Sequence, residues 1–102
     1  MAMSSRFGNK IRELREGNNL LLRQVASQLD MDLAQLSKIE KGSRQMKREQ
    51  IPFVAKIFGV SNIELETLWL TDQLVELVKD EPTANLALEA TFELLNIEKT
   101  KV

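Results

Sequence analysis

The sequence contains no cysteine, no histidine and no tyrosine among its 102 residues. Without cysteine the chain can form neither a disulfide nor a thiolate metal site. Histidine is the usual general base and the commonest metal ligand, and cysteine is the usual thiol nucleophile, so the side chains behind most enzymatic chemistry are missing. Aspartate and glutamate remain, but none stands in a recognisable carboxylate-ligand motif. The composition therefore argues against an enzyme and predicts neither a metal nor a cofactor.

Proline, glycine and long apolar runs are also scarce. Two prolines and four glycines leave little room for a turn-rich β protein, whereas the abundant Leu, Ala, Glu, Lys and Gln favour helices. No apolar run approaches the roughly 20 residues that a membrane-spanning helix needs, and the first residues lack the apolar segment of a secretory signal. We expect an all-α protein built around a single core, cytoplasmic in location, with no membrane partner and no evident small-molecule ligand.

The net charge of −1 hides an asymmetry between the two parts of the chain. Residues 1–58 carry eleven basic and six acidic residues, a net charge of +5. Residues 59–102 carry three basic and nine acidic residues, a net charge of −6. Exposed helix faces carry charge in any soluble protein, but such a difference between two parts also points to a nucleic-acid partner.

Apolar residues recur at helical spacing in six segments. The expected helices run from Ser4 or Ser5 to Glu16, Leu22 to Leu29, Leu33 to Lys41, about Gln50 to Phe58, Ser61 to Lys79, and Thr83 to Asn96. Asp80-Glu81-Pro82 interrupts the pattern, so we expect a main domain over residues 1–79 and a helical extension over residues 80–102. The main domain would bury the following apolar residues: Phe7, Ile11, Leu14, Val25, Ala26, Leu29, Leu36, Ile39, Ile51, Val54, Ala55 and Phe58.

Capping and turn residues mark the ends of these helices. Gly17 suits a left-handed position after the first helix, and Gly42 suits the end of the third. Asp32 is expected to cap the start of the third helix, and Ser61 is expected to cap the fifth in a capping box with Glu64. Residues 43–49 are expected to form an exposed basic loop.

Residues 23–42 are the most informative part of the chain. They contain two short amphipathic segments joined by a tight junction at Asp30-Met31-Asp32. The second segment has small and amide side chains on the face that its apolar residues leave free. A helix pair of this kind can place one exposed helix in the major groove of DNA. The pattern therefore favours sequence-specific binding to double-stranded DNA.

The stretch from Ile11 to Leu65 resembles the Cro/C1-type (XRE-like) helix-turn-helix domains, which include phage repressors and restriction–modification controller proteins. The segments that carry the resemblance are Ile11-Arg-Glu-Leu-Arg15, Val25-Ala26, Leu29, Leu36-Ser-Lys-Ile-Glu-Lys-Gly42 and Ile51-Pro-Phe-Val-Ala-Lys-Ile-Phe-Gly-Val-Ser61. The resemblance implies a lambda-repressor-like five-helix DNA-binding domain, here with an additional C-terminal helix. It also implies a structural salt bridge between Arg15 and Glu40.

The resemblance assigns two sets of DNA contacts. The positions that read bases are Leu33, Ala34, Gln35, Ser37 and Lys38. The positions that contact the DNA backbone are Arg23, Gln24, Lys41, Arg44, Lys47 and Arg48. Gln pairs well with adenine, Lys reaches guanine acceptors and apolar side chains contact thymine methyl groups, whereas phosphate contacts set register and affinity without reading sequence.

Two positions depart from the family pattern. Where the family usually has Ser or Thr followed by Gln, this chain has Leu21-Leu22, so the second helix lacks its customary cap. Asp30 replaces the glycine of the turn and tolerates a left-handed backbone less readily. Both departures concern fine geometry and leave the expected fold unchanged.

Residues beyond 62 exceed what a minimal DNA-binding unit needs, and both of their helices are apolar around much of their circumference. A homodimer would cover this surface and set two recognition helices about one turn of DNA apart. The residues expected in that interface are Leu68, Trp69, Leu74, Leu77, Val78, Leu88, Phe92 and Leu95. Alternatively, the final helix folds back over its own core.

Two functional hypotheses follow. The first is a homodimeric transcriptional regulator, a repressor or an activator, that binds a short inverted repeat and acts by occlusion or by contact with RNA polymerase. The second is a helix-turn-helix antitoxin or adaptor whose C-terminal helices bind a partner protein, such as a toxin. They differ in whether the apolar C-terminal segment is covered by a second copy of the chain or by another protein.

Overall fold

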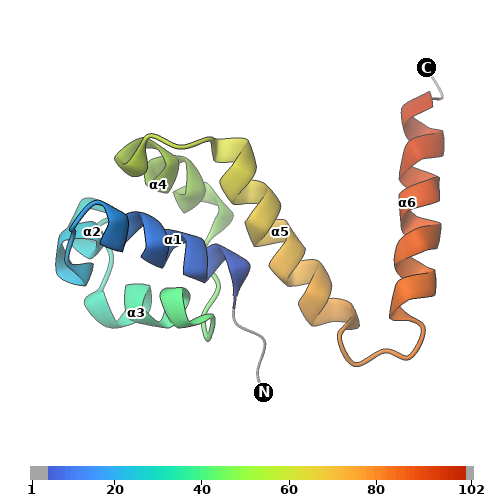
Figure 1. The fold of residues 1–102 in the computed structure, drawn as a ribbon, viewed down its shortest axis with the longest axis horizontal. Coiled ribbons are helices and arrows are strands. Elements are labelled where there is room, and N and C mark those ends of the chain that lie inside the picture. Colours follow the sequence, from blue (N-terminus) through green and yellow to red (C-terminus); the bar gives the residue numbers. More distant parts are fainter. Residues whose placement is uncertain (1–4, 101–102) are drawn as a thin grey trace. The chain divides into compact units, whose positions relative to one another are not determined.

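The computed structural model describes residues 5–100, and every regular element within that range is a helix, which confirms the predicted all-α class. Figure 1 shows the elements in chain order. They are α1 (Arg6–Gly17), α2 (Leu22–Gln28), α3 (Leu33–Lys41), the 3₁₀ helix η1 (Arg48–Gln50), α4 (Ile51–Phe58), α5 (Asn62–Val78) and α6 (Ala84–Thr100).

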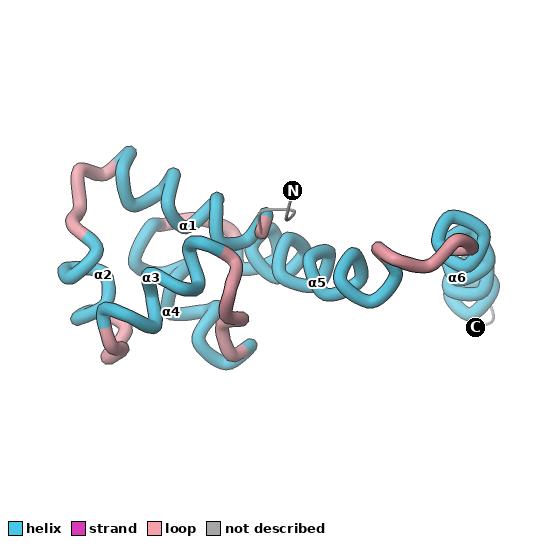
Figure 2. Tube along the Cα trace, turned by 90° about the horizontal axis from the view of Figure 1, so that it is seen from below, coloured by secondary structure: helices cyan, strands magenta, loops and turns pink. Residues whose placement is uncertain are grey.

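The chain divides into two compact units, Met1–Asp72 and Gln73–Val102, with the division inside α5. In the first unit, α1 to α4 and the first turns of α5 surround one hydrophobic core (Figures 1 and 2). The core residues are Phe7, Ile11, Val25, Ala26, Leu29, Leu36, Ile39, Met46, Ile51, Val54, Ala55 and Leu65. Ten of the twelve residues predicted to be buried are in this core, while Leu14 and Phe58 pack against it and are only partly buried.

The N-terminus of α1 is capped by a residue from the far end of the unit. The Ser5 hydroxyl accepts a hydrogen bond from the Gly8 N–H at 2.9 Å and donates one to Asp72 Oδ2 at 2.7 Å. The Asp72 carboxylate also accepts from the N–H groups of Arg6 and Phe7, each at 2.9 Å. Because the first turn of a helix has free N–H groups and a positive dipole end, this carboxylate fixes α5 to α1.

The ends of the helices depart from the sequence predictions in three places. The left-handed residue after α1 is Asn19, with φ of 56°, whereas Gly17 lies within the helix. Asp32 stands at the start of α3, but its side chain makes no capping hydrogen bond. The last helix continues to Thr100, four residues beyond the predicted Asn96.

Two of the predicted caps, Gly42 and Ser61, are present, but among the described residues no hydrogen bond from the Ser61 N–H to the Glu64 side chain completes the predicted capping box. Gly42 and Gly59 end α3 and α4 in the left-handed conformation, with φ of 83° and 64°. The Ser61 hydroxyl accepts from the Glu64 N–H at 3.3 Å and so caps α5. These caps hold the first unit's helices to the lengths that the sequence indicates.

Candidate nucleic-acid interface

The buried side of α3 anchors the helix in the core. Leu36 is completely buried and Ile39 is 1% exposed, both facing the other helices of the first unit. On the opposite side Leu33 is 50% exposed, and Ala34 and Lys38 are also exposed. Of the remaining residues predicted to read bases, Gln35 and Ser37 are half-buried. Helix α3 thus presents its first turns to solvent on a fixed support.

The junction between α2 and α3 is tight and uses a left-handed residue. Asp30 has φ of 53°, so it adopts the conformation for which the family has glycine. The turn is closed by backbone hydrogen bonds from Asp30 N–H to the Ser27 carbonyl at 3.1 Å and from Met31 N–H to the Ala26 carbonyl at 2.9 Å. Aspartate is one of the few non-glycine residues that tolerate this conformation. The replacement therefore preserves the turn.

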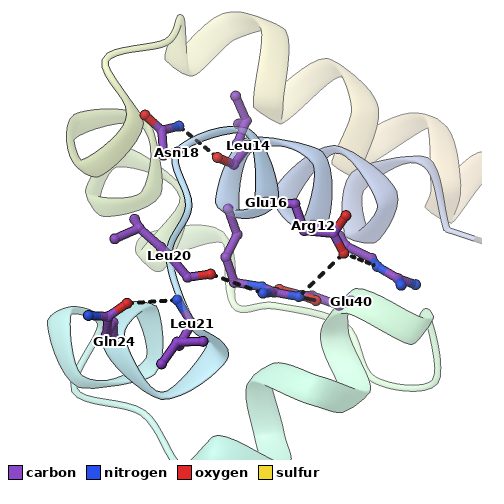
Figure 3. Close-up of polar contacts among 9 residues, drawn as sticks. Arg12, Leu14, Glu16, Asn18, Leu20, Leu21, Gln24 and Glu40 are labelled. Carbon is purple, nitrogen blue, oxygen red and sulfur yellow. Dashed lines mark hydrogen bonds and ion pairs between the residues drawn. The ribbon is translucent and has the colours of Figure 1, made fainter.

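No described side chain caps the first-turn N–H groups of α2, but the N–H of Leu21, the residue before the helix, is bonded by a side chain within it. Gln24 Oε1 accepts a hydrogen bond from the Leu21 N–H at 2.7 Å, as Figure 3 shows. The side-chain oxygen of Gln24 is therefore engaged with the protein, which leaves only N–H groups for a phosphate. Arg23, beside it at the start of α2, is exposed. The prediction that α2 lacks its customary side-chain cap is confirmed, whereas the bond between Leu21 and Gln24 was not predicted.

A nearly buried salt bridge connects α1 to α3. Arg15 Nε lies 2.8 Å from Glu40 Oε2, and Arg15 Nη2 lies 3.0 Å from Glu40 Oε1, so the contact is bidentate. A third donor, Nη1, reaches the Leu20 carbonyl at 3.1 Å; Figure 3 labels Leu20 and Glu40. The hydrogen bonds that Arg15 donates to the Glu40 carboxylate raise the pKa of Arg15. This confirms the predicted pairing and ties α3 to both α1 and the α1–α2 connection.

Close contact of α1 with the end of α3 requires a glycine. A Cβ atom at Gly8 would collide with the backbone carbonyl oxygens of Ile39 and Glu40. A Cβ at Gly42, already left-handed, would lie 2.9 Å from the Ser5 Cβ. The two glycines therefore allow the last turn of α3 to pack directly on the first turns of α1.

The basic loop after α3 is not fully exposed, contrary to the sequence prediction. Arg44 and Lys47 are exposed, but Met46 between them is only 1% exposed and belongs to the core. The last basic residue, Arg48, lies over the Trp69 ring at 5.6 Å from its centroid and pairs with Glu66 at 3.6 Å. A lone apolar residue among polar ones was the available signal, and helical periodicity cannot detect it.

The residues predicted to form a dimer interface differ in their environment. Leu68 and Trp69 pack against the core of the first unit, so their apolar surface is partly used within the chain. Leu74, Leu77, Leu88, Phe92 and Leu95 are exposed, and Val78 is half-buried. The largest exposed fractions in this set are 74% for Leu77 and 67% for Phe92.

Two negative findings apply to the described residues. Within them, no three His, Cys, Asp or Glu side chains gather as a metal-binding group. None of the helices described is long and apolar enough to cross a membrane.

Comparison with known proteins agrees with this geometry. The profile of the family described as "Helix-turn-helix domain" matches residues 8–70. A helix-turn-helix-type transcriptional activator of Enterococcus faecalis is 31% identical over 80 residues, which cover 78% of this chain and 38% of the relative. This chain thus spans less than two fifths of that relative's length.

A solved structure has a similar fold. The crystal structure of a restriction–modification controller protein from Aeromonas hydrophila aligns with a TM-score of 0.55 and 26% identity, and covers 60% of this chain and 92% of the controller protein. The matched profile, the activator and the controller protein all agree with the Cro/C1-type resemblance drawn from the sequence. The chain belongs to the helix-turn-helix domain family.

Proposed function

We propose that this protein is a sequence-specific, double-stranded DNA-binding regulator of transcription whose recognition helix is α3. The observation that carries the proposal is the anchoring of α3 by Leu36, Ile39 and the Arg15–Glu40 bridge, with Leu33, Ala34 and Lys38 left in solvent. A helix held in this way can enter a major groove without rearranging. The two relatives, named as a transcriptional activator and a restriction–modification controller, support a regulatory rather than an enzymatic function.

Base recognition would come from the first turns of α3. Gln35 has the amide needed for a bidentate contact with adenine, and Lys38 has a cation that suits the guanine acceptors N7 and O6. Leu33 and Ala34 would lie against thymine methyl groups, and Ser37 would donate to or accept from a base edge. The half-exposed Leu33 gains most from such a contact, because it leaves water on binding.

Backbone contacts would come from residues on both sides of α3. Arg23 and Gln24 stand at the start of α2, where helix N–H groups also favour a phosphate. Lys41, Arg44 and Lys47 follow along the end of α3 and the loop. Arg48 would contribute least, since Glu66 and Trp69 already hold its guanidinium. Contacts of this kind raise affinity for every sequence alike.

The proposed regulator acts as a homodimer on a short inverted repeat. From Gln73 to Lys99, no residue is buried, and Leu77, Phe92 and Leu95 expose 74%, 67% and 56% of their surface. Apolar residues at this density favour association. A two-fold dimer would present two copies of α3 to half-sites about 34 Å apart.

The same exposed residues also support the second candidate, an antitoxin or adaptor that binds a partner protein. α6 combines exposed Leu86, Phe92 and Leu95 with acidic Glu89 and Glu93. Light scattering of the purified chain at micromolar concentration separates the candidates. A dimer supports the regulator, whereas a monomer would contradict the homodimer and favour the partner-binding protein.

The DNA-binding proposal is tested with duplexes selected by the protein from a random library. Fluorescence anisotropy should show tight binding to selected duplexes and weak binding to scrambled ones, with log affinity falling against log salt by about 0.9 per phosphate contact. Replacing Gln35 or Lys38 by Ala should cost about 1–3 kcal/mol and relax preference at individual base pairs, whereas Arg44→Ala should weaken both DNAs equally. Equal affinity for selected and scrambled duplexes would disprove the proposal.

A further inference from the structure

The loop between α3 and η1, residues 43–47, is fixed at three points. At its start, the N–H groups of Ser43 and Arg44 both donate to the Lys38 carbonyl, at 3.0 and 3.3 Å. In its middle, the side chain of Met46 is buried in the core. At its end, the chain enters η1, with the Gln50 N–H bonded to the Lys47 carbonyl at 3.0 Å. A loop held in this way has little conformational freedom left to lose.

The middle of the loop is bonded to α5 by one side chain. The indole N–H of Trp69, the only tryptophan in the chain, donates to the Met46 carbonyl at 2.8 Å. Trp69 itself packs against the core, and Arg48 lies over its ring. Trp69 therefore holds the backbone at the residue that separates Arg44 from Lys47.

The cationic side chains on either side of Met46 point to solvent. Arg44 and Lys47 are both exposed, and no ion pair within the described residues involves either of them. Their backbone is thus fixed while their charges remain available. Ordering a loop during binding costs free energy for each immobilised residue, so a loop ordered in advance gives tighter binding.

We propose that Trp69 is a positioning residue for the DNA backbone: through its hydrogen bond to Met46 it holds the loop so that Arg44 and Lys47 meet phosphates without further ordering. This inference rests on the proposed DNA-binding function and deepens it. It also gives Trp69 a role within one chain, in addition to the predicted role between two chains.

The test compares Trp69→Phe with Thr71→Val. The phenyl ring keeps most of the packing and the surface under Arg48, but it has no N–H for the Met46 carbonyl. Thr71→Val removes a hydroxyl that bonds only within α5, to the Thr67 carbonyl at 2.7 Å, and so serves as the matched control. Trp69→Phe should weaken binding by about threefold to tenfold, equally for a selected and a scrambled duplex, whereas Thr71→Val should leave both affinities unchanged.

A double-mutant cycle with Lys47→Ala separates positioning from general destabilisation. If Trp69 orders the loop, Lys47→Ala should reduce DNA affinity less in the Trp69→Phe background than in the wild type. The affinity loss of the double variant should then be smaller than the product of the two single losses by a factor of more than about two. Losses that multiply fully, in variants that remain folded, would contradict the inference.

NMR relaxation of the free wild-type protein gives a test that does not depend on any variant folding. Backbone order parameters over residues 43–47 should be about 0.85, as in rigid elements, and values below about 0.6 would overturn the inference. If the wild-type protein binds the selected duplex, and Trp69→Phe and Thr71→Val bind it with the same affinity, this inference is overturned while the proposed DNA-binding function stands. A wild-type protein that binds neither duplex would overturn the proposed function as well.

Discussion

The two units of the chain differ in what they bury. The first unit places twelve apolar residues in one core, and six of them have no exposed surface: Ile11, Val25, Leu36, Ile51, Val54 and Leu65. From Gln73 to Lys99, by contrast, no described residue is buried, although the stretch is rich in leucine. The first unit has a buried core, although some of its apolar residues, such as Ile63 and Phe53, are exposed. From Gln73 to Lys99, by comparison, the described apolar residues are all exposed or half-buried.

This contrast separates folding from association. Burial of apolar area is the main favourable contribution to folding, at about 25 cal/mol per Å². A helix such as α6, with exposed Leu86, Phe92 and Leu94, gains little of this energy on its own. We therefore expect the first unit to determine the stability of the chain and the second to determine its partners.

The largest expected effect breaks the first unit's core. Leu36→Ala, at a completely buried position of α3, should lower the free energy of unfolding by about 2–5 kcal/mol because it leaves a cavity. Leu86→Ala, at a residue 68% exposed, makes the same chemical change in the second unit and should cost less than about 0.5 kcal/mol in dilute solution. Denaturant titration of both variants measures the difference. Equal losses would show that α6 is as well packed as the core.

Sequence patterns predicted the first unit well because its signals are local. Ten of the twelve residues that helical periodicity predicted to be buried are in the core, and Gly42 and Ser61 were correctly placed as caps. The Arg15–Glu40 bridge came from the family resemblance, since nothing in the spacing of two residues 25 positions apart indicates contact. Local chemistry and resemblance together were enough for this fold.

What the sequence missed depends on contacts between distant residues. Asp72 caps α1 from 67 positions away, and Trp69 bonds to Met46 across 23 positions. Neither contact has a local signature, because each forms only after the helices have packed. The hydrogen bond from the Leu21 N–H to Gln24 spans only three residues, but it depends on a side-chain conformation that composition does not reveal.

The second expected effect concerns the apolar surface of α6. If the protein dimerises through it, Leu95→Glu should shift the chain to a monomer, because it places a charge among residues that lose water on association. Affinity for an inverted repeat should then fall by about a hundredfold, since each half-site binds without the other. Analytical ultracentrifugation and anisotropy measure the two changes.

Ala90→Glu provides the control for this variant. It adds the same charge to α6 at an exposed residue on the side of the helix opposite Leu88, Phe92 and Leu95. This variant should remain a dimer and bind as tightly as the wild type. If the Leu95→Glu variant is still a dimer, α6 does not form the interface, and the exposed apolar residues of α5 become the next candidates.

The smallest expected effect is the loss of stability when an exposed ion pair is removed, and it should be similar in the two units. Each has an exposed ion pair on a helix: Arg12–Glu16 at 2.8 Å in the first unit and Glu76–Lys79 at 3.0 Å in the second. Solvent screens both pairs, so Glu16→Gln and Glu76→Gln should each change stability very little. Their pH windows nevertheless differ.

The hydrogen bond from Arg12 lowers the pKa of Glu16 below its ordinary 4.5, so its contribution is present above that pH and is lost as pH falls through the lowered value. The hydrogen bond to Glu76 raises the pKa of Lys79 above its ordinary 10.5, so that contribution is present below this value and is lost as pH rises through the raised one. The unfolding temperatures of the wild type and both variants should therefore differ only slightly near neutral pH. The difference between the wild type and Glu16→Gln should vanish in acid, and the difference between the wild type and Glu76→Gln should vanish in strong alkali. If Glu16→Gln were far more damaging than Glu76→Gln, burial would not be what distinguishes the two units, because neither pair is buried.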